Sequence, residues 1–133
     1  MKVIIKKPSN LFTSEQMEVI ESFIKLLQSE LVLSNDVQIN FIEKRVEPMT
    51  TGVRKPNNKI YVLSYKRMLI DILRTLAHEW IHEFQHQKMG LSDDQKIQDI
   101  GGKEENMANA LGGVMVKKFE KTFPNFKNKL YGE

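Results

Sequence analysis

The residues best suited to chemistry lie together in one short stretch of the chain. All three histidines of the 133-residue sequence, His78, His82 and His86, fall between residues 75 and 86, and Glu79 directly follows the first. On a helix, residues four apart project from one face, one turn apart, so His78 and His82 can meet at one metal ion. This spacing, H-E-x-x-H, is typical of sites in which two imidazoles bind Zn²⁺ and the glutamate acts as general base.

The expected chemistry is hydrolysis assisted by zinc. Glu79 is rotated by about 100° from His78 around the helix axis, so its carboxylate does not compete for the metal. It can take a proton from a water molecule whose pKa the ion lowers to ~7, as that water attacks a carbonyl. The same spacing also arises by chance, but residues 76–77 and 80–81 are apolar, as a buried metal helix requires. The sequence therefore predicts one Zn²⁺ per chain.

A second, overlapping H-E-x-x-H runs from His82 to His86 and leaves the register open. We favour the first register, because residues 75–77 before it are small or apolar, whereas the second approaches a polar helix end at Lys88. His86 is then either a surface residue near the helix C-terminus, where a positive charge is favourable, or a neighbour of the active site.

The segment after the metal helix supplies a candidate third ligand. Residues 105–109 read Glu-Asn-Met-Ala-Asn. Together with H-E-x-x-H they resemble zinc peptidases of the gluzincin type, whose third ligand is the glutamate of an E-x-x-A-[ND] pattern on the next helix. The resemblance implies that Glu105 is the ligand, that Ala108 lets the two helices approach closely, and that Asn109 hydrogen-bonds a ligand histidine. Glu104 is the competing ligand; it lies one residue off this face and otherwise serves as a carboxylate in the first helical turn.

The resemblance covers residues 50–120 and is strongest to small ImmA/IrrE-like, SprT-like and phage-encoded minimal metallopeptidases. Gln85 stands where the longer metzincin pattern needs a glycine, and the loop between the metal helices is shorter than in large gluzincins. The resemblance implies a minimal zincin-like domain that hydrolyses bonds of a peptide or protein substrate. Candidates for stabilising the oxyanion are Tyr61, Tyr65, His86 and Arg54.

Hydrophobic periodicity and turn residues predict the elements that position these side chains. The expected strands are residues 2–7, 37–44, 50–54 and 59–63, and the expected helices are residues 14–33, 65 or 68 to 89, and 103–122. Thr13 and Gln16 have the spacing of a capping box for the first helix. Turn residues 55–58 join the last two strands, and Gly90 ends the metal helix.

This order, β-α-β-β-β-α-α, predicts a single α+β domain over residues 1–133, with a small antiparallel or mixed sheet packed on the metal helix. In the resembled peptidases, a strand before the metal helix forms the rim of the cleft, and its free edge pairs with an extended peptide. Residues 50–54 or 61–64 are the candidates for that strand. Residues 91–102 form a polar connection that can begin a turn at 92–94, and the lysine-rich tail at 125–133 is expected to pack weakly.

The composition is that of an ordinary soluble domain, with 41% hydrophobic and 28% charged residues. No apolar run is long enough to span a membrane. The chain has no cysteine, so disulfides and thiolate zinc ligands are excluded and a cytoplasmic location is expected. The net charge is +3, with lysines concentrated near both ends. A nucleic-acid partner is therefore an alternative, but a solvated lysine face is the commoner reason for such a pattern.

Two further interpretations stay open. A zinc-binding domain of the same fold could act in protein or nucleic-acid interaction without turnover, although such a domain has no chemical need for Glu79. Alternatively, the histidines are incidental and the protein holds no metal. The metal content of the purified protein separates the second of these from the rest.

Overall fold

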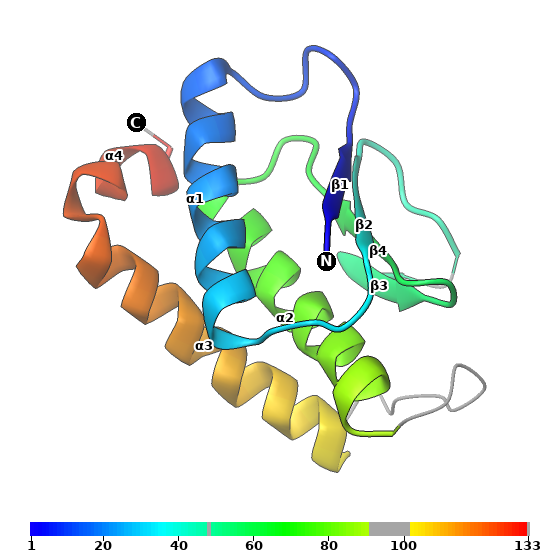
Figure 1. The fold of residues 1–133 in the computed structure, drawn as a ribbon. Coiled ribbons are helices and arrows are strands. Elements are labelled where there is room, and N and C mark those ends of the chain that lie inside the picture. Colours follow the sequence, from blue (N-terminus) through cyan, green and yellow to red (C-terminus); the bar gives the residue numbers. More distant parts are fainter. Residues whose placement is uncertain (48, 91–101, 133) are drawn as a thin grey trace.

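The computed structural model describes residues 1–47, 49–90 and 102–132. Within them the chain has an α+β fold, with its helices on one side of a four-stranded sheet (Figure 1). The strands are β1 (Val3–Lys6), β2 (Val37–Ile42), β3 (Gly52–Lys55) and β4 (Lys59–Leu63). The helices are α1 (Ser14–Glu30), α2 (Leu69–Lys88), α3 (Lys103–Thr122) and α4 (Lys127–Leu130), and a short 3-10 helix at Pro124–Phe126 precedes α4. The predicted order of strands and long helices is confirmed.

The sheet is mixed, with the strand order β1-β2-β4-β3. β1 and β4 both run parallel to β2, whereas β3 is antiparallel to β4. β4 therefore has a partner on each side, and β3 lies at an edge. Of the two segments expected to offer a free edge, residues 61–64 are the wrong choice, because they belong largely to the interior strand β4. Residues 50–54 include most of the edge strand.

The inward face of the sheet follows the predicted alternation. Val37, Ile39 and Phe41 of β2 are at most 1% exposed, and Ile60 and Val62 of β4 are fully buried. These side chains belong to one hydrophobic core together with residues of α1 and α2. Because successive strand residues point to opposite faces, the residues between them face away from the helices.

Three local sequence signals form the structures predicted for them. Thr13 and Gln16 make a capping box at the start of α1, in which each side chain accepts a hydrogen bond from the backbone N–H of the other. In the β3–β4 turn, Asn57 and Asn58 have φ of 68° and 58°, the left-handed conformation that tight hairpin turns require. Gly90 follows α2 with φ of 80°, as a glycine after a helix C-terminus commonly does.

α2 is the central helix and contacts α1, α3, β3 and β4. Its Trp80 is fully buried, and the indole N–H donates to the backbone carbonyl of Leu31 at 2.9 Å. Leu31 is the C-cap of α1, which ends at Glu30 rather than at residue 33 as predicted. The bond from Trp80 holds the chain at this point, where it leaves the helix towards β2.

The connection into α2 is held by Arg67. Its guanidinium donates to the carbonyl oxygens of Leu63 and Asp71 and to Oγ1 of Thr75. These bonds tie the end of β4 to the first two turns of α2. They also hold Thr75, which lies one turn before Glu79 and touches β3 (below).

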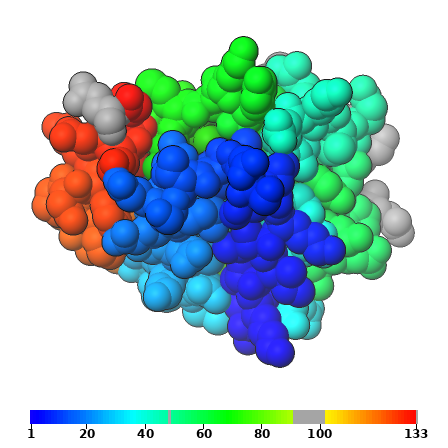
Figure 2. All heavy atoms as spheres, turned by 90° about the horizontal axis from the view of Figure 1, so that it is seen from above, coloured from blue at the N-terminus to red at the C-terminus, as the bar shows by residue number. Residues whose placement is uncertain are grey.

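The C-terminal segment packs closely, contrary to expectation. Leu130 is fully buried, and the rings of Phe123 and Phe126 stack with their centroids 5.4 Å apart. Lys129 forms an ion pair with Glu15 of α1, and the C-terminal residues lie beside α1 in both overall views (Figures 1 and 2). The prediction of a weakly packed tail is wrong, because the three apolar residues recur three or four positions apart and face the core together.

The predicted turn at residues 92–94 lies outside the described residues. Within the ranges that the structure describes, no helix has the length and apolar character needed to cross a membrane.

Candidate metal centre

Two helices bring three potential zinc ligands to one point. His78 and His82 lie on α2, and Glu105 lies in the first turn of α3. Oε1 of Glu105 is 2.5 Å from Nε2 of His78 and 3.1 Å from Nε2 of His82, and the two imidazole nitrogens are 3.1 Å apart. Three donors of the types that zinc prefers therefore face one another.

The spacing of these donors suits a tetrahedral ion. Zinc–ligand bonds of about 2.0–2.1 Å separate tetrahedral ligands by about 3.3 Å. The two separations that involve His82 are within about 0.2 Å of this value. The contact between His78 and Glu105, at 2.5 Å, would have to open by about 0.8 Å on binding. The side chain of His78 is 23% exposed and that of Glu105 is 13% exposed, so both side chains are partly open to solvent. The residues present fit a zinc ion.

The hydrogen bonds around His82 leave one of its ring nitrogens available. Nδ1 of His82 is 2.9 Å from Oε1 of Gln85, and Nε2 of the Gln85 amide donates to the backbone carbonyl of Glu104 at 2.9 Å. Because a carbonyl only accepts hydrogen bonds, the amide is oriented with its oxygen towards His82, which assigns the imidazole proton to Nδ1. The lone pair of Nε2 then faces His78 and Glu105.

Small residues allow α3 to approach α2 beside the ligands. Ala77 on α2 and Ala108 on α3 are both fully buried. A Cβ atom at Gly112 would lie 3.8 Å from the Ala77 Cβ and from the backbone nitrogen of His78, which is ordinary van der Waals contact. The close packing of the two helices carries Glu105 to the histidines on α2.

The other residues predicted on α3 have distinct places. The Asn109 side chain, one turn after Glu105, hydrogen-bonds His78. Glu104, the competing ligand, is not in the group of converging donors; it contributes its backbone carbonyl to Gln85 instead. Its side chain is half-buried.

Glu79 is buried against β3. The residue is 7% exposed, and the backbone N–H of Arg54 donates to its carboxylate. At Gly52, a Cβ atom would lie 2.5 Å from Cγ2 of Thr75 and 3.0 Å from Cγ of Glu79. β3 therefore lies directly on the face of α2 that carries Glu79, and position 52 has room only for glycine.

The electrostatics of the metal-free site shift the pKa values of Glu79 and His78 towards their neutral forms. Burial, and then the negative charge of Glu105, raises the pKa of Glu79 to about 8, although the N–H of Arg54 acts in the opposite direction. Burial, and then the charge of His82, lowers the pKa of His78, although Glu105 acts in the opposite direction. Neutral imidazole is the form that binds a metal. A bound dication would favour ionised Glu79 and so oppose the rise in its pKa.

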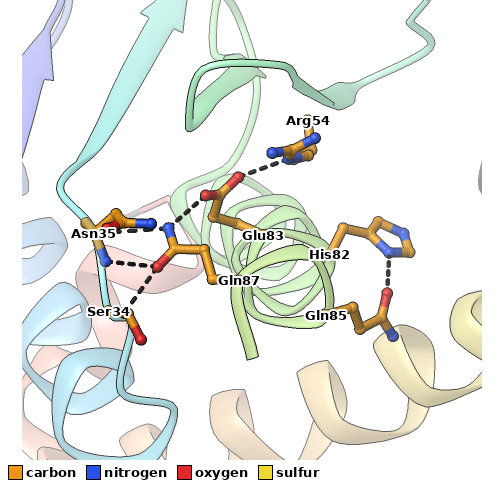
Figure 3. A network of polar contacts seen from close by, with 7 residues as sticks. All are labelled: Ser34, Asn35, Arg54, His82, Glu83, Gln85 and Gln87. Carbon is orange, nitrogen blue, oxygen red and sulfur yellow. Dashed lines mark hydrogen bonds and ion pairs between the residues drawn. The ribbon is translucent and has the colours of Figure 1, made fainter. Parts of the chain in front are cut away.

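The residues of the second H-E-x-x-H register do not form a metal-binding group among the described residues. Its glutamate, Glu83, is fully buried, is 2.6 Å from Nε of Arg54, and accepts a hydrogen bond from Gln87 (Figure 3). His86 is half-buried one turn beyond His82, and it is not in the group of donors that converge among the described residues. The structure thus brings together the candidate ligands of the first register.

Of the candidates for oxyanion stabilisation, His86 lies one turn beyond His82, and the other three have the following places. The guanidinium of Arg54 is taken up by its buried ion pair. Tyr61 projects from β4 to the sheet face away from α2, because its neighbours Ile60 and Val62 face the core. Tyr65 is 50% exposed and precedes the first turn of α2, more than two helical turns before His78.

Two residues at the site were missed by sequence reasoning. Gln85 lies three residues after His82 and seven after His78, so it shares their face of the helix, and this spacing was visible in the sequence. Gly52 left only a weak signal, because a glycine within a strand can mark a close approach of another element but does not say which one.

Comparison of the chain with protein-family models, with curated proteins and with solved structures finds no match.

Proposed function

We propose that this chain is a zinc metallopeptidase in which His78, His82 and Glu105 hold one Zn²⁺ and Glu79 is the general base. The observation that carries the proposal is the convergence of three suitable donors from two helices, with a buried carboxylate next to them on α2. A chance H-E-x-x-H on a solvated helix has no reason to meet a glutamate from a second helix.

Each residue has a definable part in peptide hydrolysis. When bound, zinc supplies a Lewis acid that polarises a carbonyl and lowers the pKa of water. Glu79 accepts a proton from the attacking water and passes it to the leaving amine. The N–H of Arg54 holds the carboxylate of Glu79 in place, and Asn109 and Gln85 do the same for the imidazoles of His78 and His82.

An extended peptide is the substrate that suits the surroundings of the site. β3 lies at the edge of the sheet and against the helix face that carries Glu79. The backbone groups on the outer side of such an edge strand can pair with a peptide by strand addition. On the opposite side of the molecule, Lys118 and Lys129 pair with Glu30 and Glu15 of α1. That pairing neutralises part of the C-terminal positive charge, which favours peptide over nucleic acid as the partner.

The test compares the wild type with Glu79→Gln. Both proteins are loaded with one equivalent of zinc and incubated with a complex mixture of peptides, and new termini are identified by mass spectrometry. We expect the wild type to cleave the mixture and Glu79→Gln to hold the same zinc but lose turnover by at least about 100-fold, since general-base catalysis contributes about 10²–10⁴-fold.

Two results would count against the proposal in different ways. Equal cleavage by both proteins would mean that the activity comes from elsewhere. Stoichiometric zinc binding without cleavage by either protein would favour the alternative of a zinc-binding domain that acts through interaction.

A further inference from the structure

Gln85 is a buried polar residue that serves two elements at once. It is fully buried on α2, and its side chain points towards α3, whereas Glu83 and Gln87 leave the helix in other directions (Figure 3). One end of its amide is 2.9 Å from Nδ1 of His82, and the other end donates to the carbonyl of Glu104 at 2.9 Å. Both hydrogen-bonding ends of this side chain are therefore used, on two different helices.

The first contact controls which nitrogen of His82 is free. In solution a neutral imidazole exchanges between two tautomers, and only the one with the proton on Nδ1 offers Nε2 as a ligand. The amide oxygen of Gln85 accepts from Nδ1–H and so stabilises this tautomer. It also restricts rotation of the ring, since the ring is held at one edge while Nε2 points at the ligand position.

The second contact controls where Glu105 begins. α3 starts at the N-cap Gly102, which has no side chain to make a capping hydrogen bond. The carbonyl of Glu104 belongs to the peptide group that leads into Glu105, so a bond to that carbonyl fixes the position of Glu105 relative to α2. The donor to it is the same side chain that orients His82.

We propose that Gln85 is a positioning residue that sets two of the three zinc ligands together, His82 through its tautomer and Glu105 through the first turn of α3. The proposal rests on the metal site proposed above but not on hydrolysis. Hydrogen-bond partners of ligands commonly contribute 10–100-fold to metal affinity. A partner that serves two ligands should lie at the upper end of that range.

The experiment measures zinc affinity by competition with a chromophoric chelator, together with the electronic spectrum of the Co²⁺-substituted protein. Gln85→Met keeps most of the side-chain volume and removes both hydrogen bonds. We expect it to weaken zinc binding by about 30- to 100-fold and to change the ligand-field bands of Co²⁺. Gln85→Glu keeps an acceptor for His82 but loses the donor to the Glu104 carbonyl. Because its carboxylate also makes His82 a more basic ligand, the Co²⁺ spectrum rather than the zinc affinity reports the lost bond, and we expect the ligand-field bands to change.

Gln87→Met is the matched control, because it removes a glutamine two residues further along the same helix. Gln87 accepts from the backbone N–H groups of Ser34 and Asn35 at 2.8 Å and does not touch a ligand. This variant should lower the thermal midpoint and leave zinc affinity and the Co²⁺ spectrum unchanged.

The outcomes separate the two proposals. Wild-type affinity and an unchanged Co²⁺ spectrum in Gln85→Met would overturn the role of Gln85 while leaving the metal site standing. Equal losses in Gln85→Met and Gln87→Met would also overturn it, because they would show a general effect of stability. If Gln85→Met does not fold, Gln85→Glu decides, and an unchanged Co²⁺ spectrum in that variant overturns the bond to Glu104. Absence of zinc binding by the wild type would remove both proposals together.

Discussion

At the scale of single residues, Glu79 and Gly52 depend on each other. Glu79 is a carboxylate buried on a helix, a position that is unfavourable for a charge unless the surroundings hold it. The edge strand provides that support, because the N–H of Arg54 donates to the carboxylate. The strand comes close enough to do so only because residue 52 has no side chain.

Gly52→Ala is therefore expected to destabilise the protein and to disturb Glu79. The new methyl group would overlap Cγ2 of Thr75 at 2.5 Å, and Thr75 is a buried, β-branched helix residue with little freedom to turn away. Overpacking of this kind costs about 1–3 kcal/mol, which urea denaturation would measure. Gly113→Ala is the control, because a Cβ there meets nothing within 4 Å and should stabilise α3 by up to about 1 kcal/mol. A neutral effect of Gly52→Ala would mean that β3 does not lie as close to α2 as described.

At the scale of elements, α2 presents three functional faces to three different neighbours. The ligand histidines and Gln85 face α3, and Glu79 and Glu83, four residues apart, face β3. Gln87 faces the connection between α1 and β2 (Figure 3). The helix thus fixes the relative positions of the proposed ligands, the proposed general base and the edge strand, because side chains on one rigid helix keep constant angles to one another.

The pair Arg54–Glu83 is expected to be a strong anchor between β3 and α2. Both side chains are nearly inaccessible, at 6% and 0% exposed. Arg54→Met should cost about 3–5 kcal/mol, because it leaves the Glu83 carboxylate buried without its counter-charge. The double variant Arg54→Met with Glu83→Met should recover much of that loss, since it removes both desolvated charges. A double-mutant cycle of unfolding free energies measures the coupling, and a cost below about 1 kcal/mol for the single change, as for exposed pairs, would show that water reaches the pair.

Contacts between residues close together in the sequence could be predicted, whereas contacts between distant residues could not. Thr13 with Gln16 and the Asn57–Asn58 turn act within a few residues, so their structures were readable in advance. The spacing of His78 and His82 was enough to put both on one helix face, whereas Glu105 was predicted only from the resemblance of residues 105–109 to a known pattern. The supporting contacts join residues far apart in the chain: 29 positions separate Arg54 from Glu83, and 19 separate Gln85 from Glu104.

Residue type was also a misleading guide to burial at Glu83 and in the C-terminal tail. Glutamate is almost never fully buried unless it is paired, so nothing local marks Glu83 as an interior residue. In the C-terminal tail, the many lysines suggest an exposed segment, yet Leu130 is fully buried. In both cases the burial is decided by a partner element that the sequence pattern does not name.

At the scale of the whole molecule, the proposed metal site joins the two halves of the chain. His78 and His82 belong to the helix that packs on the sheet, and Glu105 belongs to a helix that touches α1 and α2. A zinc ion that binds all three residues should therefore stabilise the folded chain as a unit rather than one loop of it.

Zinc is accordingly expected to raise the thermal midpoint of the wild type, by mass action on the folded state. Free zinc at one hundred times its dissociation constant contributes about 2.7 kcal/mol, which corresponds to roughly 10 °C for a chain of this size. Calorimetry with and without zinc should show this shift in the wild type and in His86→Ala, and should show it lost in His78→Ala and Glu105→Ala, because only the latter two lose a converging donor.

The reverse pattern, with the shift lost in His86→Ala and kept in His78→Ala, would assign the metal to the second register. Glu83 would then have to leave its ion pair with Arg54 to serve as the base, and the order of the three faces of α2 argued above would be wrong.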